Sequence, residues 1–299
     1  MDRLDAMATL VAAVDGGSLS AASRALGMPL ATVSRKVSEL EAHLRTRLVV
    51  RTSRRLILTE AGQAYIAVAR RILDEVDDAE RAASGEYRVP RGHLTLTAPI
   101  MFGRLHVEPV VLDFLKAYPD ITARLLLADH VLNLVDDHVD VAVRVGRLPD
   151  SAMVALRLGE IRWVACASPD YLARRGEPQD PDALPGHDCV MFEGLYSSQI
   201  WTFGRGAETR QIAIRPRLSV NSADAAIAAA TSGAGITRVL SYQVADAVAA
   251  GALTLILTPF EPDPLPVHLL YAGQSMLPLK LRAFLDFASP RLRASLRGR

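Results

Sequence analysis

Residues 18–43, SLSAASRALGMPLATVSRKVSELEAH, contain the pattern that decides the fold of the N-terminal part of this chain. Ser18 can cap a short helix that runs through Leu26, because a serine oxygen accepts the unpaired N–H groups of a first helical turn. Gly27 supplies a tight turn, and a second helix is predicted from about Pro29 to His43. This second helix has one apolar face, formed by Val33, Val37, Leu40 and Leu44. Two helices joined by a short glycine turn indicate a helix-turn-helix over about residues 18–43.

The opposite face of the second helix carries small and hydroxyl side chains and a single base, so it can enter a major groove closely. Arg35 can donate two hydrogen bonds to a guanine, and Ser34 can bond to a base or a phosphate. Each of these residues taken alone is more often a solvated surface residue, but the adjacent glycine turn and apolar face favour contact with DNA. We therefore predict a DNA-binding face made of Leu30, Thr32, Ser34, Arg35 and Ser38.

A wing hairpin is predicted next, because two short β-prone runs, residues 48–50 and 56–58, flank a polar, basic tip. Three arginines are placed there to contact phosphates or the minor groove: Arg51, Arg54 and Arg55. Residues 20–60 contain eight basic and three acidic residues, a net charge of +5, whereas the rest of the chain carries −4. A basic segment on a nearly neutral body indicates that one part of the protein meets a polyanion. Residues 1–60 are thus expected to form a winged helix-turn-helix domain that binds DNA.

A long helix is predicted directly after the wing, over residues 61–88, with Thr59 as its N-terminal cap. Apolar residues recur in it at spacings of four and three, as in the heptad seam of a coiled coil: Tyr65, Ala69, Ile72, Val76, Ala79 and Ala83. Such a seam needs a partner surface, which is either the core of its own chain or a second copy. Because dimeric regulators read paired half-sites, the position behind a DNA-binding unit favours a linker helix that pairs two chains.

From residue 93 to the end, strand patterns alternate with helical patterns, which predicts α/β structure with largely parallel sheets. The strand pattern at 268–272 is expected to return to the first α/β unit. The region would then form two lobes, one made of about 93–162 with 268–299 and the other of 163–267. The fold class predicted for the whole chain is therefore α/β and multidomain.

Length and composition bound the possible classes of protein. At 299 residues the chain is long enough for two or three folded units. No apolar run approaches the roughly 18 to 20 residues of a membrane span, and the acidic N-terminus lacks the pattern of a secretion signal. We therefore expect a cytoplasmic protein with no membrane partner. Cys166 and Cys189 lack the number and spacing of a disulfide framework or a zinc site, and both are interpreted as buried apolar residues.

Patterns typical of enzymes are weak. Gly233-Ala234-Gly235 lacks the third glycine of a dinucleotide motif, and neither a P-loop nor a serine nucleophile elbow is present. Residues 136–138, with Asp140, could suggest a metal site, but adjacent residues at a helix end point in different directions and are usually solvated. We expect no catalytic residue, no metal and no cofactor.

The N-terminal motifs together resemble the DNA-binding domain of LysR-type transcription regulators, over about 60 residues. The matching residues, in order, are Ser20-Ala21-Ala22, Ala25-Leu26-Gly27, Thr32-Val33-Ser34-Arg35, Leu40-Glu41, Arg51-Thr52, Arg54-Arg55 and Leu58-Thr59-Glu60-Ala61-Gly62. The resemblance implies a bacterial regulator with a winged helix-turn-helix, a linker helix that pairs two subunits, and an effector-binding domain over 93–299. That domain would have two α/β lobes similar to those of periplasmic solute-binding proteins. The implied partners are double-stranded promoter DNA, further copies in a homodimer or homotetramer, and a small-molecule effector.

One position departs from the family pattern. The family often has a serine or threonine cap followed by glutamine where this sequence has Pro29-Leu30. Proline fits a first helical turn, but Leu30 cannot make the hydrogen bonds of a glutamine to a base. An apolar contact with a thymine methyl group is the alternative at this position.

The resemblance also implies a set of effector-binding residues on the two lobes: Pro99, Ile100, Met101, Phe102, Arg144, Asn221, Ser222 and Ala223. Backbone N–H groups between a strand and a helix can face a ligand there. Met101 and Phe102 favour a partly aromatic or aliphatic ligand, and a carboxylate could be held by backbone donors and Arg144. A structural ion pair is an equally good interpretation of Arg144.

Two other functions stay open on the sequence. One is an architectural DNA-binding protein whose C-terminal region only oligomerises, and the other is an enzyme built on the two-lobed domain. Stabilisation by a ligand would favour a sensor over the first, whereas turnover of a small molecule would indicate the second.

Overall fold

The computed structural model describes residues 2–51, 56–84, 89–130, 139–149, 152–193, 199–273 and 277–297. Contacts divide the chain into two compact units. The first contains residues 1–93 with the short segments 120–122 and 278–280, and the second contains the rest. Each unit has a hydrophobic core of its own.

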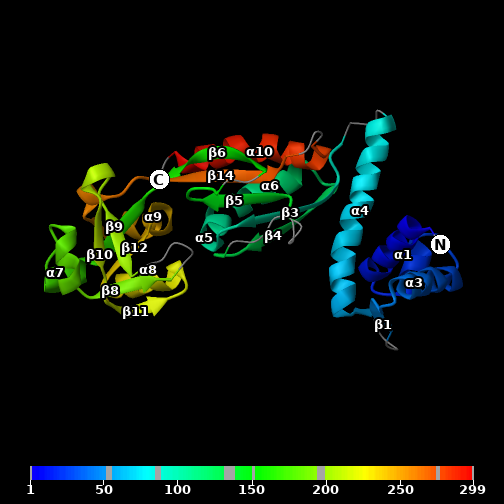
Figure 1. Ribbon diagram of the computed structural model, residues 1–299, viewed down its shortest axis with the longest axis horizontal. Helices are drawn as coiled ribbons and strands as arrows, with labels where there is room; N and C mark the ends of the chain where they lie inside the picture. Colours follow the sequence, from blue (N-terminus) through cyan, green and yellow to red (C-terminus); the bar gives the residue numbers. More distant parts are fainter. Residues whose placement is uncertain are drawn as a thin grey trace. The chain divides into compact units, whose positions relative to one another are not determined.

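The first unit combines helices with a short antiparallel hairpin (Figure 1). Its elements are α1 (Arg3–Asp15), α2 (Leu19–Ala25), α3 (Leu30–Leu44), β1 (Val49–Arg51), β2 (Leu56–Leu58) and α4 (Glu60–Ser84). Local signals set the helix ends: Ser18 Oγ accepts the N–H of Ala21 at 3.1 Å and so caps α2. Gly27, with φ of 63°, turns the chain between α2 and α3 in a left-handed conformation that favours glycine. The predicted helix-turn-helix is confirmed.

The apolar face of α3 closes the core of this unit. Val37 and Leu40 are buried against Leu10 of α1, in a cluster that also holds Leu48 and Ile66. A buried aliphatic side chain contributes about 1.5 to 3 kcal/mol relative to an exposed one. Burial of one helical face therefore fixes which face of α3 remains outside.

The hairpin is attached to the helices that precede and follow it. The carboxylate of Glu41 accepts the N–H groups of Leu48 and Val49 at 2.8 and 3.0 Å. Thr59 Oγ1 accepts the N–H of Gly62 at 2.9 Å and so caps α4, as predicted. A Cβ atom at Gly62 would lie 1.9 Å from the carbonyl oxygen of Leu48, so only glycine fits. The second half of the family motif thus joins the wing to α4.

The seam predicted along α4 is divided in the structure. Ala69 is buried within the first unit, and Tyr65 packs against the core cluster of its own chain. These two residues of the seam therefore have a partner surface in their own chain, where α1 packs against α4. Ile72 and Val76 are only partly buried, and the side chains of Ala79 and Ala83 lie outside the described residues.

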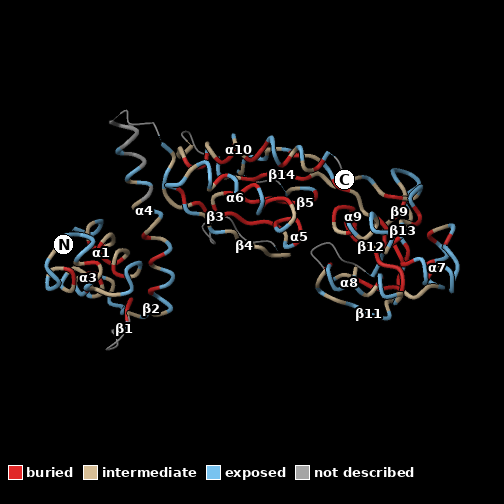
Figure 2. The backbone as a smooth tube through the Cα atoms, turned by 180° about the vertical axis from the view of Figure 1, so that it is seen from behind, coloured by how far each residue is buried: buried red, intermediate tan, exposed pale blue. Residues whose placement is uncertain are grey.

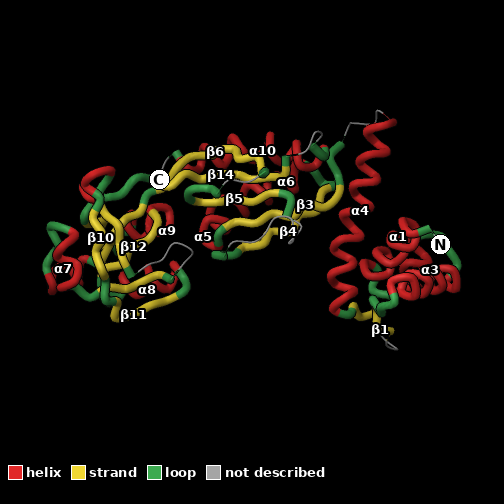
Figure 3. The backbone as a smooth tube through the Cα atoms, viewed as in Figure 1, coloured by secondary structure: helices red, strands yellow, loops and turns green. Residues whose placement is uncertain are grey.

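The second unit contains a first five-stranded sheet in the order β4-β3-β5-β14-β6. Its elements are β3 (Gly92–Ala98), α5 (Ile100–Phe102), the π-helical turn η1 (Gly103–Val107), α6 (Glu108–Ala117), β4 (Ile121–Leu127), β5 (Val141–Val145), β6 (Met153–Ile161), β14 (Leu265–Ala272) and α10 (Leu279–Leu296). Phe114 of α6 meets Phe284 of α10 edge to face, with 5.1 Å between the ring centroids. We call this sheet with its helices the first lobe (Figure 3).

A second five-stranded sheet has the order β11-β8-β12-β7-β13. Its lobe contains β7 (Trp163–Ala167), α7 (Pro169–Arg175), the 3-10 turn η2 (Pro181–Gly186), β8 (Cys189–Phe192), β9 (Ile200–Phe203), η3 (Gly206–Glu208), β10 (Arg210–Ala213), β11 (Pro216–Val220), α8 (Ala223–Thr231), β12 (Ile236–Leu240), α9 (Ser241–Ala249), β13 (Thr254–Ile256) and η4 (Thr258–Phe260). Strands β9 and β10 form a separate antiparallel pair. Figure 2, which colours each residue by its burial, shows buried residues along β12, whereas β11 at the edge of this sheet is largely exposed. The two-lobed α/β architecture is confirmed.

Strand direction and number differ from the sequence-based expectation. The sheets are mixed rather than largely parallel, because β14 runs antiparallel to both of its neighbours and β7 runs antiparallel to β12 and β13. Strands β6 and β8 were not expected. Residues 212–220 do not form one continuous strand, because β10 ends at Ala213 and β11 begins at Pro216. In the described part of the chain, no helix has the length and apolar character needed to cross a membrane.

Candidate nucleic-acid interface and ligand-binding residues

The outer face of α3 presents the residues predicted to contact DNA. Leu30, Arg35 and Ser38 are exposed, and Thr32 and Ser34 are partly exposed. Leu30 is the first residue of α3, and Pro29 before it makes no side-chain cap. The buried positions of α3 lie on the opposite face, so the face that carries these five residues is open to solvent in the first unit.

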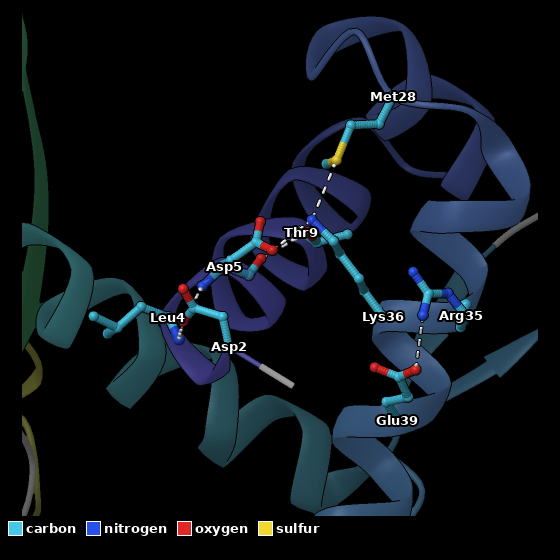
Figure 4. A network of polar contacts seen from close by, with 8 residues as sticks. All are labelled: Asp2, Leu4, Asp5, Thr9, Met28, Arg35, Lys36 and Glu39. Carbon is cyan, nitrogen blue, oxygen red and sulfur yellow. Dashed lines mark hydrogen bonds and ion pairs between the residues drawn. The ribbon is translucent and has the colours of Figure 1, made fainter.

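Two adjacent bases on α3 have different surroundings (Figure 4). Arg35 is 67% exposed and pairs with Glu39 on the same helix, at 3.3 Å. Lys36 is 17% exposed, and its ammonium lies 2.5 Å from the carboxylate of Asp5 in α1 and 3.3 Å from the sulfur of Met28. Lys36 therefore links α1 and the turn to α3, whereas an exposed i,i+4 pair such as Arg35–Glu39 is weak and easily exchanged. Sequence reasoning did not single out Lys36, because its partner lies 31 positions away along the chain.

The wing is described only in part. In the hairpin Val50 pairs with Ile57 and Arg51 with Leu56. Val50 and Ile57 are about half exposed, so this pair forms an apolar outer face on the hairpin. Arg51 ends β1, and the predicted contacts Arg54 and Arg55 lie outside the described residues.

In the first lobe, the predicted effector segment starts at Pro99 and has both exposed and buried members. Ile100 is 43% exposed, whereas Met101 and Phe102 are buried. The N–H of Ile100 donates to the carboxylate of Asp129 at 3.0 Å. The first backbone donor expected for an anionic ligand is therefore already bound to a carboxylate of the protein.

Phe102 packs against an aromatic residue of the second lobe. Its ring meets Tyr242 of α9 edge to face at 5.4 Å, and His106 lies 4.7 Å from Phe102 and 5.5 Å from Tyr242. Burial is the main cause that raises the pKa of Tyr242, and the nearby carboxylates of Asp129 and Asp224 raise it further. Phe102 thus belongs to a contact between the lobes as well as to the predicted effector segment.

The predicted residues of the second lobe lie at the start of α8. Asn221 is exposed, Ser222 caps α8 by accepting the N–H of Ala225 at 3.4 Å, and Ala223 is buried. The next residue, Asp224, forms an exposed ion pair with Arg104 at 3.1 Å. This pair brings the start of α8 close to the turn that follows Phe102.

Arg144 is buried in β5, where its register partner on β14 is His268.

Metal and thiol chemistry have little support in the described residues. They contain no group of three or more histidine, cysteine, aspartate or glutamate residues that could hold a metal. Residues 136–138 of the weak metal candidate lie outside them, and Asp140 accepts the N–H of Thr95 at 2.7 Å. Cys166 and Cys189 are free and buried, and burial raises the pKa of each thiol to about 12.

Comparison with known proteins agrees with this arrangement. The model of bacterial regulatory helix-turn-helix proteins of the lysR family matches residues 4–63, and that of the LysR substrate binding domain matches residues 88–293. An HTH-type transcriptional repressor of Pseudomonas aeruginosa is 36% identical over 289 residues, which cover 96% of this chain and 91% of the relative.

Two solved structures extend the likeness to almost the whole chain. CrgA, a LysR-type transcriptional regulator from Neisseria meningitidis, aligns with a TM-score of 0.62 at 32% identity and covers 96% of this chain and 98% of its own. The full-length structure of the Vibrio cholerae virulence activator AphB aligns with a TM-score of 0.62 at 27% identity, over 95% of this chain and 98% of its own. The chain belongs to the LysR family of transcription regulators, which bind DNA and respond to small-molecule effectors and are not enzymes.

Proposed function

We propose that this protein selects promoter DNA by sequence through Leu30, Thr32, Ser34, Arg35 and Ser38 of α3, while Arg51, Arg54 and Arg55 of the wing contact phosphates. The observation that carries the proposal is the contrast between two neighbouring bases. Lys36 is held by Asp5, whereas Arg35 is 67% exposed and its ion pair with Glu39 on the same helix is weak. An arginine with an available guanidinium on a close-fitting helical face suits a guanine in the major groove.

A small effector is proposed to bind between the lobes, near Pro99–Phe102 and Asn221–Ala223, with Arg144 on the hinge side. The Arg104–Asp224 ion pair supports this position, because it places two of these segments near one another. The bond from Ile100 N–H to Asp129 argues against a ligand carboxylate at that helix start. The effector can change transcription only through different affinities for two arrangements of the protein.

The protein is further proposed to act in the cytoplasm as a homodimer or homotetramer. Its DNA-binding domain would be residues 1–60, its linker helix 61–88 and its effector domain 93–299, with lobes of about 93–162 with 268–299 and of 163–267. Ile72 and Val76 support pairing through the linker helix, since both apolar side chains are only partly buried within their own chain.

DNase footprinting on the DNA that flanks the gene tests DNA recognition. We expect one or two protected stretches containing related half-sites. Arg35→Ala should lose this protection, whereas substitution of a wing arginine such as Arg54→Ala should only weaken it. Uniform protection along the fragment would reject recognition by sequence.

Calorimetry of the full chain with metabolites of the neighbouring genes tests the proposed effector site. An effector bound equally by wild type, Arg144→Ala and Ser222→Ala would show that the site lies elsewhere.

A further inference from the structure

An exposed leucine stands at the first position of the helix proposed to contact DNA. Leu30 is the first residue of α3 and is 47% exposed. Pro29, which precedes it, provides no side-chain cap for the helix. Leu30, Ser34 and Ser38 follow one another at intervals of four and so share one ridge of the outer face. Arg35 is exposed beside this ridge. The corner of α3 that precedes the polar residues is therefore apolar.

The chemistry of the major groove restricts what such a corner can recognise. Base edges there present hydrogen-bond donors and acceptors, and the C5 methyl group of thymine is their apolar feature. A leucine placed against a donor or acceptor would remove water from it without replacing its hydrogen bond, which is unfavourable. Against a methyl group, the same leucine buries apolar surface on both sides.

We propose that Leu30 selects a thymine in each half-site by contact with its C5 methyl group. This inference rests on the proposed function, since it requires α3 to lie in the major groove. The ligand chemistry is a thymine methyl within duplex DNA, read next to the base contacted by Arg35. A guanine-reading arginine and a methyl-reading leucine on one helix would together specify neighbouring positions of the half-site.

Uracil substitution tests the contact, because uracil differs from thymine only by that methyl group. Binding sites are first selected from a random duplex pool with the full-length protein, and each thymine of the selected site is then replaced singly by uracil. For wild type, we expect roughly three- to tenfold weaker binding at one thymine in each half-site. Leu30→Ala should bind the thymine and uracil versions of that site equally well.

Leu4→Ala provides a matched control, because Leu4 is also an exposed leucine of this unit, at 40%, but belongs to α1 (Figure 4). It should keep the discrimination of wild type, and circular dichroism of both variants should match that of wild type. If no uracil substitution affects wild type, or if Leu30→Ala still discriminates, the inference is overturned. Failure of the pool to yield any preferred sequence would instead refute DNA recognition itself, which separates the two proposals.

Discussion

Some side chains of the helix-turn-helix hold the domain together, whereas others are exposed and available to contact DNA. Lys36, Glu41 and Thr59 are engaged with other elements, whereas Leu30 and Arg35 are exposed, and Arg35 pairs with Glu39 of its own helix. Residues of a shared motif therefore have two different physical tasks. Substitution of the first group should affect stability, and substitution of the second should affect DNA binding.

Gly62 provides a residue-scale prediction about stability. Gly62→Ala places a methyl group against the carbonyl oxygen of Leu48, a backbone atom that cannot move without shifting the hairpin. We expect the free energy of unfolding of the DNA-binding domain to fall by at least about 2 kcal/mol. Urea titration followed by circular dichroism measures this, with Ala61→Ser, an exposed change on the same helix, as the control. Equal midpoints for the two variants would show that the junction has room for a side chain.

The two cysteines give a prediction about pH. Burial raises the pKa of Cys166 and Cys189 from 9 to about 12, so both stay protonated in the folded protein at pH 8. A thiol reagent should label neither in the native state and both in urea. Each thiol has a higher pKa in the folded than in the unfolded protein, so keeping it protonated favours the folded state relative to high pH. This contribution to the free energy of unfolding is complete below pH 9 and is lost as the pH rises toward 12. Rapid labelling at pH 8 without denaturant would contradict the described burial.

At the scale of elements, the sequence predicted what depends on neighbouring residues. Ser18, Gly27 and Thr59 act on helix ends within a few positions, and the apolar spacing of α3 assigned its outer face correctly. Strands β6 and β8 were missed, and the direction of β14 and β7 was not foreseen, because strand pairing is decided by partners far along the chain. Asp129, which bonds the start of α5 from 29 positions away, was missed for the same reason.

The linker helix carries a prediction at this scale. Ile72→Asp should place a carboxylate in the part of α4 that its own unit covers only partly, and should separate the proposed dimer. Ala67→Asp introduces the same charge at an exposed position of α4 and should leave assembly unchanged. Sedimentation velocity distinguishes them. An Ile72→Asp variant that sediments like wild type would show that this part of the helix does not pair two chains.

For the whole molecule, the two units divide the work between DNA recognition and sensing. The relatives named above include a repressor and an activator, so the sign of regulation differs between similar proteins. What they have in common with this chain is the order of a helix-turn-helix and a substrate-binding domain. We therefore propose that this protein recognises a DNA sequence through α3 and that an effector modulates this binding.

The most direct test of that claim compares the affinities of wild type and Arg35→Ala for the selected site and for scrambled DNA of the same composition. Arg71→Ala is the control, since Arg71 also forms an exposed i,i+4 pair with a glutamate, but on α4. We predict that Arg35→Ala loses roughly 1 to 3 kcal/mol on the selected site and much less on scrambled DNA, with Arg71→Ala like wild type on both. Equal losses by Arg35→Ala on the two DNAs would contradict sequence recognition by α3.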